Sequence, residues 1–149
     1  MSVVQSVLKI DCSKMPRAPK GHQLKGHLRR GIIELSPGSV ILHRTALPIR
    51  GRKLVEEIGT RALCAWVLRF MLKNPGNIPP EWWQSEHTDR VCFPSTTYTD
   101  PQDREYAYCL EYNGRSRPKQ SIILLDENFG PKIPVPVLLE KGPRIYSTC

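Results

Sequence analysis

Prolines are spread along the whole length of this chain and restrict it to short regular elements. The 149 residues include 14 prolines, and these do not cluster in one tail. Proline lacks the backbone N–H group and interrupts the interior of helices and of central strands. The distribution therefore predicts a folded chain with irregular connections and extended segments, not a proline-rich disordered tail.

One stretch without proline, residues 52–73, has the pattern of a helix. Charged side chains occupy one face of its first half and apolar side chains occupy the opposite face. Its second half, residues 62–72, is apolar nearly all round except for Arg69, which would need a carboxylate or carbonyl partner in a core. We expect one long helix, amphipathic and then buried; an apolar run of 11 residues is too short for a membrane span, which needs about 20.

Short segments rich in β-branched and aromatic residues are predicted to be strands, namely residues 3–10, 31–35, 40–43, 105–112, 121–126 and 133–139. The turn residues at 36–39 predict a hairpin between the second and third of these segments. Segments 105–112 and 121–126 are expected to pair, and the prolines of 133–139 confine that segment to a sheet edge.

The predicted fold is a single small α+β domain over residues 1–149. One long helix at about 52–73 packs on a mostly antiparallel sheet of about five or six short strands. Within it, residues 11–30 form a basic arm or loop interrupted by proline and glycine.

Cysteine usage and the first 30 residues predict the compartment. The five cysteines are widely spaced, and none has the short spacing of a zinc knuckle or a redox motif. Residues 1–30 carry seven basic residues and no uninterrupted apolar core of a secretion signal. We therefore expect a reducing intracellular compartment, which is the cytoplasm, the nucleus or the mitochondrion, and no secretion.

All of the net charge lies in the first 52 residues. They hold ten Lys and Arg against two acids, a net charge of +8, whereas residues 53–149 are balanced at twelve against twelve. Clustered cations bind phosphate polymers by releasing counterions. The candidate anion-binding residues are Lys14, Arg17, Lys20, Lys25, Arg29 and Arg30, with Arg44, Arg50 and Arg52 extending the surface.

The identity of the anion stays open between three classes. Nucleic acid is favoured, with RNA ahead of DNA, and the alternatives are an acidic protein or membrane surface and a solvated loop without a specific partner. Residues 1–65 hold no aromatic side chain that could stack on bases. Contacts from this part of the chain are therefore expected with the backbone of a nucleic acid rather than with its bases.

A second group of residues is a candidate for partner contacts. Tryptophan is enriched at binding hot spots, and the Trp82–Trp83 pair follows two prolines. Either indole could anchor the core edge, contact a partner or stack on a base. A basic cluster between the two paired strands extends the candidate set with Arg115, Arg117 and Lys119, although such a cluster is also typical of a solvated loop tip.

No catalytic or metal-binding motif is present in the sequence. Nucleophile elbows, phosphate-binding loops, dinucleotide fingerprints and paired short Cys/His spacings are all missing. We expect no enzyme activity, no catalytic residues, no metal, no cofactor and no small-molecule substrate. The protein is expected to act within a larger assembly or as a homo-oligomer.

Residues 61–69, together with Gly76 and residues 82–87, loosely resemble the single-helix accessory subunits in the membrane arm of mitochondrial NADH dehydrogenase. The resemblance covers a short part of the chain, which departs from those subunits in its long β-rich tail and its flanking hairpin. It implies, as an alternative, a structural subunit of a large membrane complex. The main hypothesis is a non-catalytic protein of a ribonucleoprotein or viral assembly; a viral matrix-type protein on acidic membrane is a further alternative.

Overall fold

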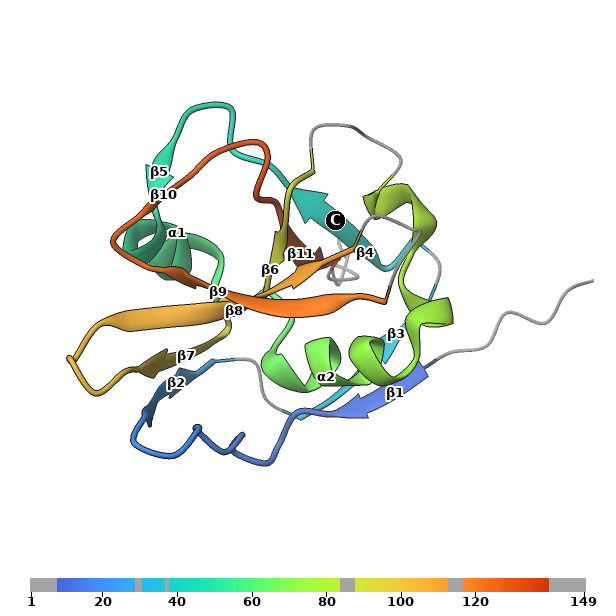
Figure 1. Cartoon of the computed structure of the whole chain (residues 1–149). Coiled ribbons are helices and arrows are strands. Elements are labelled where there is room, and N and C mark those ends of the chain that lie inside the picture. Colours follow the sequence, from blue (N-terminus) through green and yellow to red (C-terminus); the bar gives the residue numbers. More distant parts are fainter. Residues whose placement is uncertain (1–7, 29–30, 37, 84–87, 113–116, 140–149) are drawn as a thin grey trace, which may run out of the picture.

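A computed structural model describes residues 8–28, 31–36, 38–83, 88–112 and 117–139 (Figure 1). Strands account for 37% of these residues and helices for 19%. The predicted fold, with one long helix on a sheet, is therefore wrong. The chain instead forms a curled antiparallel sheet, three smaller strand pairs and two short helices.

The largest sheet is built around one central strand, β8 (Glu105–Glu111). On one side β8 pairs with two short successive strands of one bent segment, and on the other side it pairs with β9. A further strand, β2, covers the outer edge of β7. The bounds are β2 (Gln23–His27), β6 (Val91–Cys92), β7 (Thr96–Thr99) and β9 (Lys119–Leu124). The predicted strands at 105–112 and 121–126 and their pairing are confirmed, although the second strand begins and ends two residues earlier than predicted.

Three two-stranded ladders complete the β-structure. They are β1 (Leu8–Asp11) with β3 (Ile32–Leu35), β4 (Val40–His43) with β11 (Val135–Leu138), and β5 (Ile49–Arg50) with β10 (Asn128–Phe129). All three are antiparallel, and each joins segments that are distant in the sequence. The part of predicted strand 3–10 that precedes residue 8 lies outside the described residues.

The predicted hairpin between 31–35 and 40–43 is wrong, although its turn is present. The backbone N–H of Ser39 donates to the carbonyl of Ser36 at 2.9 Å, and Gly38 has the positive φ of 81° that such a turn needs. The strands on either side then diverge, because β3 pairs with β1 and β4 pairs with β11. Local turn chemistry closed the turn, but burial against distant strands selected the partners.

The expected long helix is divided into α1 (Gly51–Ile58) and α2 (Ala65–Lys73). Between them the chain pairs with β11: Leu63 N–H donates to the carbonyl of Pro136 at 3.0 Å, and Leu138 N–H donates to that of Arg61 at 2.9 Å. A helical conformation would remove both of these bonds. After α2 two 3-10 turns follow, η1 (Pro75–Asn77) and η2 (Pro80–Trp82).

The two helices bury one face each. In α1, Leu54 and Ile58 are buried. In α2, Val67 and Leu68 are among the buried residues, and the helix packs against β8 and β1 (Figure 1). The expectation that Arg69 is buried is wrong, because its side chain is exposed and its guanidinium lies 5.2 Å from the centre of the Trp66 ring.

The buried side chains form two clusters. One cluster lies around α2 and includes Leu68, Trp82 and Leu110. The other lies around α1 and includes Leu54 and Phe129. Among the helices in the described ranges, none is long and apolar enough to cross a membrane.

Three tyrosines of β7 and β8 pack on one another, and the innermost one provides a test of the core. The rings of Tyr98 and Tyr106 stack at a centroid distance of 5.5 Å, and the Tyr106 hydroxyl bonds Nδ1 of His22 at 2.8 Å. Tyr98 is fully buried, and its hydroxyl has no hydrogen-bond partner among the described residues. The Tyr98 hydroxyl therefore contributes little or nothing to the free energy of unfolding.

Replacing Tyr98 by phenylalanine is expected to leave the free energy of unfolding at about pH 8 unchanged or to raise it by about 1 kcal/mol. Burial, and then the neighbouring Tyr108, raises the pKa of Tyr98 from 10.0 to about 12. Because Tyr98 ionises near pH 10 in the unfolded chain but only near 12 in the folded one, the wild type loses stability as pH rises from 10 toward 12, and the variant is spared this loss. Denaturant unfolding at increasing pH should show a growing advantage of the variant.

Tyr106→Phe is the matched control, because it removes a hydroxyl that is hydrogen-bonded. It is expected to cost about 1 kcal/mol at about pH 8. A loss of the same size for Tyr98→Phe would mean that the Tyr98 hydroxyl is bonded in solution.

Candidate functional site: an aromatic and cationic cleft

The segment that carries the predicted basic arm, residues 11–30, is attached to regular elements at both of its ends. It begins after β1 and runs into β2, which pairs with β7. The indole N–H of Trp66 donates to the carbonyl of Lys14 at 2.7 Å and so ties the segment to α2. The segment is thus an anchored loop and an edge strand rather than a free arm.

The charged side-chain groups of this segment remain available to bind an anion. The side chains of Lys14, Arg17, Lys20 and Lys25 are exposed, and no ion pair is found for them within the described ranges. Arg29 and Arg30 lie outside the described residues. We call the stretch of chain that carries these four described cations the basic segment.

The three arginines expected to extend this surface differ in their surroundings. Arg44 donates to the carbonyl of Pro131 at 2.8 Å and to Oγ1 of Thr88 at 2.6 Å. Arg52 forms an ion pair with Asp126 at 3.0 Å. Arg50 is exposed in β5. Arg44 and Arg52 therefore already have partners within the chain, which reduces what they can offer to another anion.

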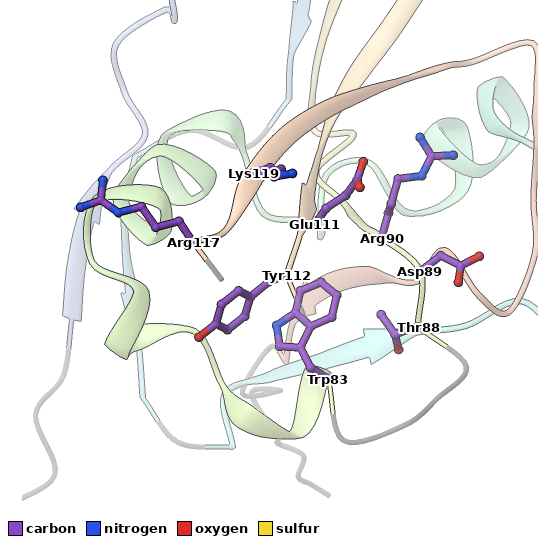
Figure 2. Close-up of a pocket in the computed structure, with 8 residues that line it drawn as sticks. All are labelled: Trp83, Thr88, Asp89, Arg90, Glu111, Tyr112, Arg117 and Lys119. Atoms are coloured by element: carbon purple, nitrogen blue, oxygen red, sulfur yellow. The ribbon is translucent and has the colours of Figure 1, made fainter. Parts of the chain in front are cut away.

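A cleft of about 630 Å³ opens where the β8–β9 hairpin meets the segment before β6 (Figure 2). Its lining combines two aromatic rings, three cations, two carboxylates and one hydroxyl. In that order the lining residues are Trp83 and Tyr112, Arg90, Arg117 and Lys119, Asp89 and Glu111, and Thr88.

Four separate segments position this lining. Trp83 follows the 3-10 turn η2, and residues 88–90 lead into β6. Tyr112 comes directly after β8, whereas Arg117 precedes β9 and Lys119 begins it. Antiparallel pairing of β8 with β6 on one side and with β9 on the other brings the last three segments to one end of the sheet.

The aromatic pair forms the centre of the cleft. The rings of Trp83 and Tyr112 meet edge to face, with centroids 6.0 Å apart and an angle of 86°. In Figure 2, Arg117 extends outward on one side of this pair and Arg90 on the other. Both rings are half-buried, so part of each ring is open to a ligand.

Charges around the pair nearly cancel but leave a positive excess. Three cations face two carboxylates, for a net charge of +1. Glu111 lies directly opposite Lys119 in the strand register, and Arg90 also donates to the carbonyl of Ile122 at 3.0 Å. Arg117 and Lys119 are exposed, which makes them the cations most accessible to a ligand.

Three of the residues expected to contact a partner therefore meet in this cleft: Trp83, Arg117 and Lys119. Trp82, in contrast, is 98% buried in the core, where it packs near Phe93. Arg115 lies outside the described residues. Neither Arg90 nor Tyr112 was among the candidate site residues predicted from the sequence. The predicted pairing of residues 105–112 with 121–126 is the signal that could have located Tyr112.

The described part of the chain has a second cavity, whose lining is less polar than that of the cleft. A second cavity of about 360 Å³ is mainly apolar and lies between Leu8, Met71 and Trp82. No group of three or more His, Cys, Asp or Glu side chains in the described ranges could hold a metal ion.

Comparison with family models, curated proteins and solved structures found no match to this chain.

Proposed function

We propose that this protein binds single-stranded RNA without catalysing a reaction, as a component of a ribonucleoprotein assembly. The observation that supports this proposal is the cleft, in which an aromatic pair is combined with exposed cations. Single-strand binders use this combination, because bases stack on aromatic rings and phosphates pair with cations.

The aromatic pair supplies the contact with a base. Base–aromatic stacking contributes about 1–3 kcal/mol per base and tolerates any sequence. The cleft volume of about 630 Å³ lies within the range of pockets that enclose small organic ligands. One unstacked base on Trp83 or Tyr112 is therefore the expected occupant.

Arg117 and Lys119 supply the contact with the phosphates on either side of that base. Arginine can hold phosphate oxygens in a bidentate arrangement, and both side chains release counterions on binding. Because the net charge of the cleft is only +1, the cleft alone binds weakly. The basic segment supplies the further, sequence-independent attraction for the RNA backbone.

Neutralising the two accessible cations of the cleft, Arg117→Gln with Lys119→Gln, is expected to weaken RNA binding about tenfold. Fluorescence anisotropy of a labelled oligouridine of about ten nucleotides measures this affinity. The matched control is Lys53→Gln with Lys73→Gln, which removes the same charge from exposed positions of α1 and α2.

The control pair is expected to change the affinity by less than about threefold, because it alters only the long-range field. Equal losses for the two pairs would mean that the cleft makes no direct contact and that only net charge matters.

A second candidate function is that of a non-catalytic subunit in a larger protein complex. It is favoured by exposed apolar side chains, since Ile32 is 67% and Leu47 is 78% exposed. Co-purification of the same protein partners before and after nuclease treatment would support this second function. Loss of all partners with nuclease would support RNA binding.

A further inference from the structure

Two pairs of buried cysteines lie within the described part of the chain. Sγ of Cys12 and Sγ of Cys64 are 2.9 Å apart, in a contact where one thiol donates to the other. Cys92 and Cys109 face each other across β6 and β8. All four side chains are fully buried and are present as thiols.

Cys64 occupies a position that favours its thiolate. It is the N-cap residue of α2, where backbone N–H groups and the helix dipole stabilise negative charge. The adjacent Cys12 thiol, followed by the backbone N–H groups of Trp66 and Val67, lowers the pKa of Cys64, although burial opposes this effect.

The second pair has the opposite character. Burial raises the pKa of Cys92 well above its usual value, and the neighbouring Cys109 raises it further. A thiol reacts with oxidants as the thiolate, so Cys64 is more reactive than Cys92. This difference provides an internal comparison between two buried pairs in one protein.

His27 holds the backbone of Cys12 in place. Its Nε2 is 2.7 Å from the carbonyl of Cys12, and its Nδ1 is 2.8 Å from Oγ1 of Thr96. The same Thr96 oxygen accepts from the N–H of Ala65, at the start of α2. This buried network joins the loop after β1 to the helix that carries Cys64. It therefore keeps the sulfur atoms of Cys12 and Cys64 close to each other.

We propose that Cys12 and Cys64 form a redox-active dithiol that closes to a disulfide in the presence of a peroxide. A disulfide bond is about 2.0 Å long, so the two sulfurs need to approach by less than about 1 Å. Local opening of the chain gives a small oxidant access to the buried pair.

The chemistry proceeds in two balanced steps. The Cys64 thiolate attacks one peroxide oxygen, forms a sulfenic acid and releases hydroxide, which takes up the thiol proton to become water. Cys12 then attacks the sulfenic sulfur, and a second water leaves with the remaining proton. With hydrogen peroxide, the protein loses two electrons and two protons, and the peroxide becomes two waters.

The disulfide would link the loop after β1 to the start of α2, across 52 residues of sequence. Such a link restricts the unfolded chain and is expected to raise the midpoint of thermal unfolding by about 10 °C. It would also fasten the beginning of the basic segment, because Lys14 follows Cys12 closely and is bonded through its carbonyl to Trp66. This inference does not depend on RNA binding.

The test treats the full-length reduced protein with hydrogen peroxide, blocks the remaining thiols with iodoacetamide, and maps cross-linked peptides by mass spectrometry without reduction. We expect the Cys12–Cys64 peptide pair to appear at least about tenfold faster than Cys92–Cys109. Cys92→Ser is the matched control and should leave the Cys12–Cys64 bond unchanged, whereas Cys12→Ser should remove it.

The wild-type map alone decides the proposal, so a variant that fails to fold does not affect the result. Preferential formation of Cys92–Cys109 would overturn the proposal. It would also be overturned if the folded protein showed no intramolecular disulfide, or showed Cys64 oxidised to a sulfinic acid while Cys12 remained alkylated.

Discussion

Neutralising the four exposed cations of the basic segment is expected to weaken binding of single-stranded RNA about 100-fold at about 0.1 M salt. The variant carries glutamine in place of Lys14, Arg17, Lys20 and Lys25. Each cation that contacts a phosphate releases counterions, so the dependence of log Kd on log salt should fall by about 3 for four contacts on a single strand. Anisotropy titrations at several salt concentrations measure both quantities.

The control for this variant removes four exposed cations from other parts of the surface. It carries glutamine in place of Lys53, Arg61, Lys73 and Lys132, all of which are exposed. Both variants have the same net charge. If they lose the same affinity and the same salt dependence, the basic segment is not a specific contact surface, and circular dichroism should confirm that each variant is folded.

Replacing Phe129 by alanine is expected to lower the free energy of unfolding by about 3–5 kcal/mol. Phe129 is fully buried in the core around α1, and it pairs with Ile49 in the β5–β10 ladder. Its ring lies so close to Gly51 that a Cβ there would be 2.8 Å from its Cε1 atom. The helix start, the ladder and the core therefore depend on the same ring, and denaturant unfolding measures the loss.

Phe70→Ala is the matched control for this prediction, because Phe70 is only half-buried on α2. A half-buried ring loses less burial on truncation, so we expect a cost of about half that of Phe129→Ala. Equal costs for the two phenylalanines would contradict the assigned core around α1.

The sequence predicted the central part of the sheet because the relevant signals are local. Residues 105–111 and 119–124 combine aromatic and β-branched side chains with a polar connection, and nearest neighbours in the chain pair with each other. The amphipathic first turns of the helix at 51–58 were also predictable from their pattern of charges.

The division of the long helix was not predictable, because its cause is a distant strand. Ala62 and Leu63 are fully buried, and a short buried apolar run has the same pattern in a helix and in an extended segment. Pairing with β11, about 75 residues later in the chain, decides between them. A Cβ at Gly59 would lie 2.6 Å from Cδ1 of Leu28, so this glycine also permits a close approach that only the tertiary structure reveals.

The candidate site was predicted only in pieces. Three of its residues were recognisable individually as candidate partner contacts, because tryptophan is enriched at binding sites and a basic loop can bind anions. They are Trp83, Arg117 and Lys119. Their meeting with Arg90 and Tyr112 depends on the register of β8 with β9 and on the path of residues 88–90 into β6. A scattered set of residues becomes a cleft only through these long-range pairings.

The most direct measurement of the central proposal is a titration of the wild-type protein into labelled single-stranded RNA at about 50 mM and about 200 mM salt. If cations of the basic segment and the cleft contact the backbone, Kd should rise about 100-fold or more between the two conditions. Tryptophan fluorescence should also change as a base reaches Trp83. No binding at the lower salt, or a Kd that stays the same at both, would contradict RNA binding by this protein.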